Sequence, residues 1–144
     1  MSSRNIADIM NMSTDDVVEP VVLPAGEYVF RVLSYKPGNI KNEKATPYVR
    51  MNLKPIEVVE ADTEVDLANA ENVQHDHWMT DKSQTIVKRF FSQNLGLETK
   101  DRSFRELFEE AVGLEVTGVI EIKMEGKDKN VATPRIQTFK RLPA

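Results

Sequence analysis

Aromatic and polar side chains alternate with apolar ones between residues 47 and 55 of this 144-residue chain. The first set comprises Tyr48, Arg50, Asn52 and Lys54, and the second comprises Val49, Met51 and Leu53. Successive side chains of a β-strand point to opposite faces, so this pattern predicts a half-buried strand. A ring on which a base stacks, beside cations that neutralise phosphates, is the chemistry that single-stranded nucleic acid requires. The alternative is an ordinary solvated face that carries two cations.

Basic residues are concentrated around this strand, although the net charge of the whole chain is −4. Residues 28–56 contain six basic residues and one acid, whereas residues 57–77 contain seven acids and no Lys or Arg. Local rather than total charge attracts a phosphate backbone, so the acidic composition does not exclude a nucleic-acid partner. Further candidates for phosphate contacts are Lys36, Lys41, Lys44, Lys123 and Arg135.

Alternation and turn residues predict the strands that must position these side chains. We expect strands over 27–35, 47–55, 72–79, 114–124 and 131–142. The segment Lys36-Pro37-Gly38-Asn39 is expected to end the first strand and to open a basic loop over 36–46. Residues 57–71 are expected to form an acidic loop, and residues 125–130 a polar hairpin turn.

Two short helices are predicted between the third and fourth strands. The first begins near Asp81 or Ser83 and ends at Gly96, a residue type that commonly terminates helices. The second begins with the capping box Ser103 to Glu106 and ends at Gly113. The residues at inward-facing helical spacing are Ile86, Phe90, Phe91, Asn94, Leu95, Phe104, Leu107, Phe108 and Val112. Lys88 and Arg89 are expected on a solvated helix face.

Three strands, helices and then two strands are the layout of an OB-fold, a mainly β, five-stranded Greek-key barrel. We expect residues 23–144 to form this domain. Residues 1–22 are expected to form a mobile arm with a short helix around Ile6, Ile9 and Met10. The ligand surface of an OB-fold lies largely on strands two and three and on the loops after strands one and four. Three of those four elements carry cations here.

The third predicted strand contains three further candidate residues, His75, His77 and Trp78. The two histidines share a face and could reach one metal ion, with acids completing the site. Zinc usually takes three or four protein ligands, and the chain has no other histidine and no cysteine, so base stacking, phosphate contact or plain strand surface is favoured. Trp78 is either a core or barrel-end residue, the favoured role for a large ring, or a second stacking platform.

Motifs typical of catalysis are absent from the sequence. It contains no phosphate-cradling glycine-rich loop, no HExxH and no Gly-x-Ser-x-Gly. The acids Asp62, Glu64 and Asp66 lack the rigid frame and nearby base that a metal-dependent nuclease needs. We expect a protein that is not an enzyme, uses no cofactor, and has neither a membrane span nor a secretory signal.

Several short segments resemble bacteriophage-encoded single-stranded DNA-binding proteins with an OB-fold. They are Leu23-Pro24-Ala25-Gly26-Glu27-Tyr28, the strand from Tyr48 to Leu53, Ile86-Val87-Lys88-Arg89-Phe90-Phe91, Glu106-Leu107 through Gly113-Leu114-Glu115-Val116, and Gln137-Thr138-Phe139-Lys140. The resemblance, which spans residues 23–142, implies sequence-independent coating of single-stranded DNA during phage replication or recombination, in the cytoplasm of a bacterial host. Phage or host replication and recombination proteins would be its partners.

The chain departs from this family at its end. Many single-strand binders finish in an acidic tail that recruits partners, whereas residues 139–144 read Phe-Lys-Arg-Leu-Pro-Ala. The rival hypothesis is a protein-interaction or virion structural module on the same small β-scaffold. The acidic segment 57–77 and the apolar residues of the N-terminal arm favour that alternative.

Overall fold

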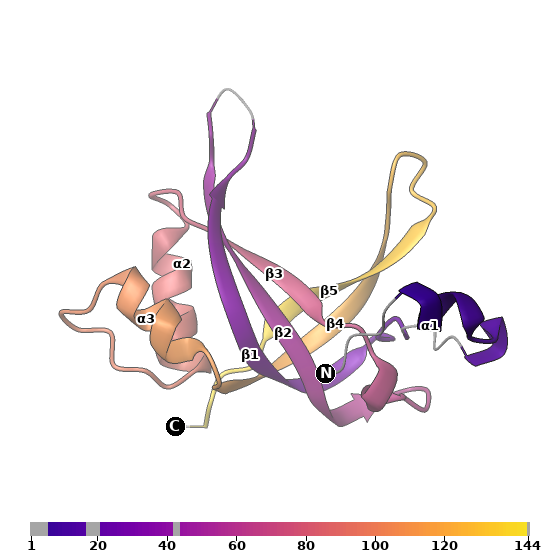
Figure 1. Ribbon diagram of the computed structural model, residues 1–144. Coiled ribbons are helices and arrows are strands. Elements are labelled where there is room, and N and C mark those ends of the chain that lie inside the picture. The colour runs from indigo at the N-terminus through magenta and orange to yellow at the C-terminus, as the bar shows by residue number, and fades with distance from the viewer. Residues whose placement is uncertain (1–5, 17–20, 42–43, 144) are drawn as a thin grey trace.

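The computed structural model describes residues 6–16, 21–41 and 44–143, and this part of the chain is mainly β (Figure 1). Within it, five strands form one antiparallel sheet in the order β3-β2-β1-β4-β5. The strands are β1 (Gly26–Asn39), β2 (Pro47–Ala61), β3 (Val73–Trp78), β4 (Glu115–Glu125) and β5 (Val131–Phe139). The predicted number of strands and their order along the chain are therefore confirmed. Within the sheet, β1 lies at the centre.

The first strand is longer than its sequence predicts. Residues 36–39 continue β1 and pair with residues 47–50 of β2, so the prediction that they end the strand was wrong. Pro37 is tolerated because β4 pairs with β1 only from Gly26 to Arg31. Among the described residues, the far half of β1 has a strand on one side alone, and proline is compatible with such an edge.

The second strand also extends beyond its prediction. Residues 57–61, expected in an acidic loop, belong to β2, and Ala61 pairs with Gly26. The remainder of that segment contains a short 3-10 turn, η2 (Leu67–Asn69), followed by a bridge between Ala70 and Val21. β1 shows three register shifts against β2, and such irregularities bend a sheet.

The helical insertion lies where it was predicted, although its inward face differs in part. It comprises α2 (Gln84–Arg89), the π-helical turn η3 (Phe90–Asn94) and α3 (Phe104–Ala111). The N-cap predicted at Ser103 is confirmed, because Ser103 Oγ accepts a hydrogen bond from the Glu106 backbone N–H at 3.2 Å. Ile86 and Val112 are exposed, contrary to prediction. Val87 takes the buried position of α2 because it lies three and four residues before the buried Phe90 and Phe91, and Val112 already has extended backbone angles.

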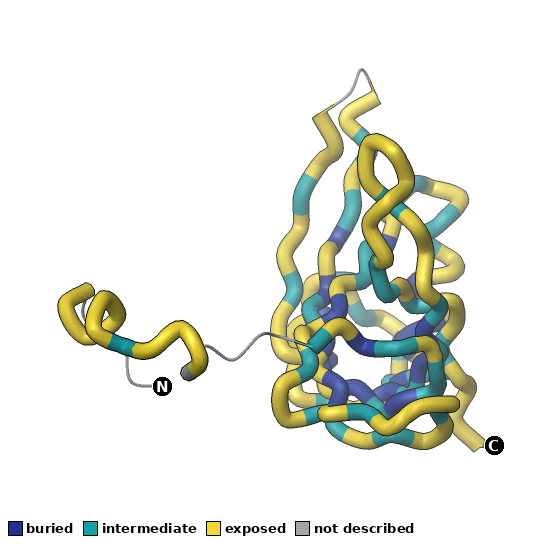
Figure 2. Tube along the Cα trace, turned by 90° about the vertical axis from the view of Figure 1, so that its right-hand side faces the viewer, coloured by how far each residue is buried: buried dark blue, intermediate teal, exposed yellow. Residues whose placement is uncertain are grey.

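The core lies between one face of the sheet and the helices α2 and α3, which lie together at one end of the strands (Figures 1 and 2). Rings connect the helical segments to each other, since the centroids of Phe91 on η3 and Phe108 on α3 are 4.8 Å apart. The buried side chains include Leu23, Tyr28, Phe30, Val32, Val49, Met51, Leu53, Val73, Val87, Phe90, Leu95, Leu107, Ala111, Val116 and Ile120.

The sheet's two edge strands approach each other through side chains. The rings of His75 on β3 and Phe139 on β5 lie 5.0 Å apart.

The N-terminal segment does not contribute to the core, because α1 (Ile6–Asn11) and the 3-10 turn η1 (Thr14–Asp16) contain no buried residue. The rest of the predicted arm, residues 1–5 and 17–20, lies outside the described residues.

Candidate nucleic-acid interface

The outward side chains of β1, β2 and β3 form three rows that cross the strands, and we call this surface the three-row face. Its inner counterpart, Val49, Met51 and Leu53, is buried, which confirms the half-buried strand. The rows follow from the pairing register of the three strands. They are Gly38, Tyr48 and Trp78; Lys36, Arg50 and Asp76; and Ser34, Asn52 and Gln74.

Two aromatic rings stand side by side in the first row. The centroids of Tyr48 and Trp78 are 5.9 Å apart and their planes make an angle of 62°. Trp78 is 41% exposed, so it does not lie in the core. A Cβ atom on Gly38 would lie 2.9 Å from both Cζ and Oη of Tyr48. The bare backbone of Gly38 therefore leaves the space that this ring position uses.

Arg50 is held in place by an acidic neighbour. Its Nε and Nη2 atoms donate hydrogen bonds to the two carboxylate oxygens of Asp76, at 2.8 and 3.0 Å. These bonds raise the pKa of Arg50 and lower that of Asp76. The guanidinium carbon also lies 5.4 Å from the centroid of the Tyr48 ring. Arg50 is thus oriented beside the ring, but its charge is largely balanced by Asp76.

Two further residues predicted to contact phosphates, Arg135 and Lys123, also form ion pairs, and they lie beyond Trp78. Arg135 Nε donates to a carboxylate oxygen of Glu125 at 2.7 Å, and the pKa of Glu125 is lowered by that hydrogen bond. Lys123 Nζ lies 3.3 Å from Glu121. Both Lys123 and Arg135 line a hollow of about 280 Å³ together with Asp76 and Trp78. The fold therefore brings these two predicted residues to the border of the three-row face.

Four lysines that were predicted to contact phosphates are exposed, and they form no ion pair with any residue in the described ranges. Lys36 lies on β1 directly opposite Arg50, and Lys54 lies further along β2, opposite Arg31. Lys41 and Lys44 are at the tip of the β1–β2 hairpin. Unpaired exposed lysines are the groups through which a phosphate backbone is neutralised, with release of its counterions.

The two histidines lie on the inner side of β3. His77 is only 5% exposed, so it lies on the inner side of β3 and not on the three-row face, and its contact with nucleic acid stays a prediction. Burial, together with the charge of nearby His75, lowers the pKa of His77 to about 3. The pKa of His75 is also lowered by burial. No group of three potential metal ligands occurs among the described residues.

Some functional candidates were missed at the level of sequence. Asp76 shares the parity of Gln74 and Trp78, but its pairing with Arg50 depends on the register between β2 and β3. Gly38 falls in a segment that looks like a turn. The position of Lys88 and Arg89 on an exposed helix face was predicted correctly.

No model of a known protein family matches this chain, and no curated protein is significantly similar to it. In the part of the chain that the structure describes, no helix has the length and apolar character needed to cross a membrane. The three-row face is therefore the feature of the molecule on which a functional proposal rests.

Proposed function

We propose that this protein binds single-stranded DNA without sequence preference and without catalysis, on an OB-type barrel. The observation that carries the proposal is the pair of adjacent rings, partly buried Tyr48 and exposed Trp78, on a face bordered by lysines that form no ion pair with a described residue. Aromatic platforms beside a positive track are the combination used for sequence-tolerant single-strand binding, because every base has a π-face.

The strand order supports the barrel. β1 lies between β2 and β4, the helices join β3 to β4, and the edge strands β3 and β5 approach through His75 and Phe139. A barrel would be completed by these two edges. Its expected ligand surface would then coincide with the three-row face and the two hairpins next to it.

The geometry suggests a division of labour on this face. Bases stack on Tyr48 and Trp78, while Lys36, Lys54 and the hairpin lysines Lys41 and Lys44 neutralise phosphates. The β1–β2 and β4–β5 hairpins project in the same direction from the sheet (Figure 1). A DNA strand bound on the three-row face would therefore run between them. A setting in phage replication or recombination, inside the bacterial host, is supported by the family resemblance alone.

The test is an anisotropy titration with fluorescein-labelled oligo-dT of about 30 nucleotides, a length that covers at least one OB-fold footprint. Tight binding to the single strand that weakens with salt, and little binding to an equal duplex, is the expected result. Tyr48→Ala and Trp78→Ala should each cost about 1–3 kcal/mol of binding free energy. No binding at low salt would overturn the proposal.

The rival, a protein-interaction module, is favoured by one observation. Ile6 and Met10 are 72% and 77% exposed on α1, which leaves apolar surface available to a partner. Apolar docking does not share the steep salt dependence of DNA coating. Weak dependence on salt, together with loss of binding on Ile6→Ser rather than on Tyr48→Ala, would select this second function.

A further inference from the structure

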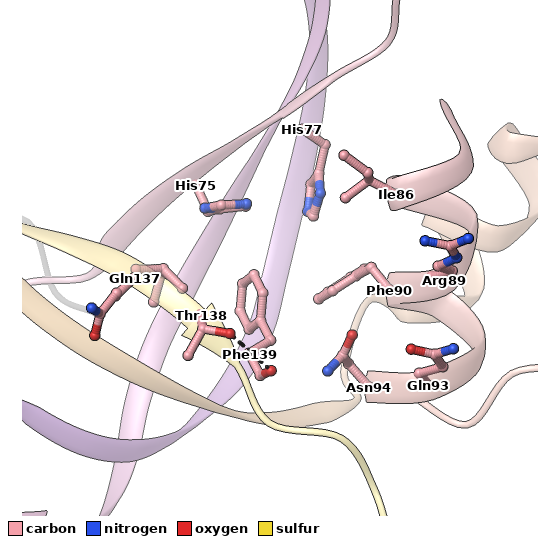
Figure 3. Close-up of a pocket in the computed structure, with 11 residues that line it drawn as sticks. His75, His77, Ile86, Arg89, Phe90, Gln93, Asn94, Gln137, Thr138 and Phe139 are labelled. Atoms are coloured by element: carbon pink, nitrogen blue, oxygen red, sulfur yellow. Dashed lines mark hydrogen bonds between the residues drawn. The ribbon is translucent and has the colours of Figure 1, made fainter. Parts of the chain in front are cut away.

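A hollow of about 360 Å³ opens between β3, β5 and the α2–η3 helical segment (Figure 3). Ring-bearing side chains from all three elements form its walls. Its lining residues are His75, His77, Ile86, Arg89, Phe90, Gln93, Asn94, Ile136, Gln137, Thr138 and Phe139.

The walls of this hollow are aromatic. The ring of Phe90 lies 4.7 Å from that of His77 and 4.8 Å from that of Phe139. His75 lies 5.0 Å from Phe139 on the other side. A flat aromatic guest would therefore meet ring faces and edges on several sides, which is a favourable surrounding for stacked or edge-to-face contacts.

Polar groups without protein partners also face the hollow. The Nε2 atom of His77 is buried and forms no hydrogen bond with the described residues, although its ring points into the hollow (Figure 3). A buried polar atom left unpaired is costly, so a ligand able to pair with it is favoured. Arg89 and Gln93, at the helical wall, make no side-chain hydrogen bond or ion pair with a described residue.

The hollow shares the wall residue His75 with two further hollows that border Trp78 on the three-row face. That residue lines this hollow, the hollow beside Trp78 and Arg135, and a third one of about 260 Å³ that also borders Trp78. A single DNA strand that leaves Trp78 can therefore follow the edge of β3 past His75 and reach Phe139 and Phe90.

We propose that this hollow receives one unpaired base of the strand bound on the three-row face. A base offers the flat rings that Phe90 and Phe139 suit, and a polar edge that reaches His77 Nε2 and the Gln93 amide. Arg89 at the rim takes the adjoining phosphate. This inference rests on the proposed function, since it adds a second base site to the same bound strand.

Photo-crosslinking tests the occupant directly. Oligo-dT in which single positions carry 5-iodo-deoxyuridine is bound, irradiated and mapped by mass spectrometry. We expect labels in two separate places, on the peptides that contain Tyr48 or Trp78 and on those that contain Phe90 or Phe139. Labels confined to Tyr48 and Trp78 would overturn this inference and leave the proposed function intact, whereas absence of binding would overturn both.

A variant in which a larger side chain fills the hollow provides a second test. Gln93→Trp should remove labelling of Phe90 and Phe139 and weaken oligo-dT binding at least about fivefold, the lower end for one stacked base. Ser92→Trp, on the exposed neighbouring position, should change neither. Retained labelling of Tyr48 shows that the variant is folded. Labelling of the hollow by free 5-iodo-deoxyuridine monophosphate but not by the oligonucleotide would also overturn the inference, because the occupant would then be a free nucleotide.

Discussion

Arg50 and Asp76 face each other on neighbouring strands and share two hydrogen bonds of 2.8 and 3.0 Å. The acid therefore has two opposite effects on a bound phosphate backbone. It fixes the guanidinium beside the ring of Tyr48, and it cancels the charge that the guanidinium would offer. If the face binds DNA as proposed, Asp76 limits its affinity, whereas Lys36 and Lys54 form no ion pair with a described residue.

Replacing Asp76 by asparagine separates these effects, because the amide oxygen still accepts a hydrogen bond while the negative charge is lost. We expect Asp76→Asn to bind oligo-dT more tightly at low salt, with a slope of log K against log salt that is steeper by about 0.7. Anisotropy titrations over a salt series measure both quantities. Glu110→Gln, on α3 and paired with Arg102, makes the same change in net charge away from the face. Equal effects of the two variants would contradict the local role of Asp76.

The Tyr48 ring can be disturbed without altering Tyr48 itself. A methyl group at Gly38 would sit 2.9 Å from Cζ and Oη of that ring, so Gly38→Ala must displace it. We expect weaker oligo-dT binding, by less than the loss in Tyr48→Ala, with an unchanged circular dichroism spectrum. Ser34→Ala, two rows along the same strand, serves as the control and should bind like the parent. Unchanged affinity in Gly38→Ala would show that the ring position is not used.

Unpaired and paired cations should differ in their contribution to salt dependence. Lys36→Ala and Lys54→Ala should each reduce the magnitude of the salt slope by about 0.7, because one fewer counterion is released from the single strand. Arg50→Ala should reduce it by less, since Asp76 already neutralises much of that charge. Lys100→Ala, outside the face, should leave the slope unaltered. A larger change for Arg50 than for Lys36 would contradict this ranking.

Stability should decrease with acidification below neutral pH. Burial lowers the pKa of His77 to about 3 in the folded chain, whereas an unfolded histidine has an ordinary pKa near 6.5. The unfolded state therefore binds a proton that the folded state does not, and the free energy of unfolding should fall by roughly 1 kcal/mol per pH unit below that range. His75 acts in the same direction.

Urea unfolding at pH 7.5 and pH 5.5 measures this loss. His77→Phe should lose less stability over that interval than the parent, and neither protein should change through its histidines between pH 7.5 and 8.5. The lowered pKa of Asp76 adds to the loss only near the ordinary carboxylate range, so it does not obscure the interval chosen. An identical loss in His77→Phe would show that His77 titrates normally.

The local parts of this molecule could be predicted from its sequence. The alternation around Arg50 fixes which side chains share a face, because the period of two is a property of the strand itself. The capping box at Ser103 is equally local. The pairing of Arg50 with Asp76, and of Tyr48 with Trp78, depends instead on the register between two strands, which no short pattern specifies.

Tertiary packing decided one further position. Trp78 was expected in the core or at the barrel end because large rings are usually buried, but its parity on β3 places it outward while His77 takes the inner position. The hollow around Phe139 arises from the docking of the η3 turn against two strand edges. Its residues come from separate parts of the chain, so their proximity has no signature in the sequence.

The half-paired portion of β1 has a consequence for how copies of this protein behave in concentrated solution. Beyond Val32, whose backbone groups bond to Gly113 and Leu114, one side of that strand offers backbone groups to which another chain could add as an extra strand. Lys36 and Pro37 lie on this stretch, one bringing charge repulsion between copies and the other lacking an N–H. The same lysine that is proposed to hold a phosphate thus also opposes edge-to-edge aggregation.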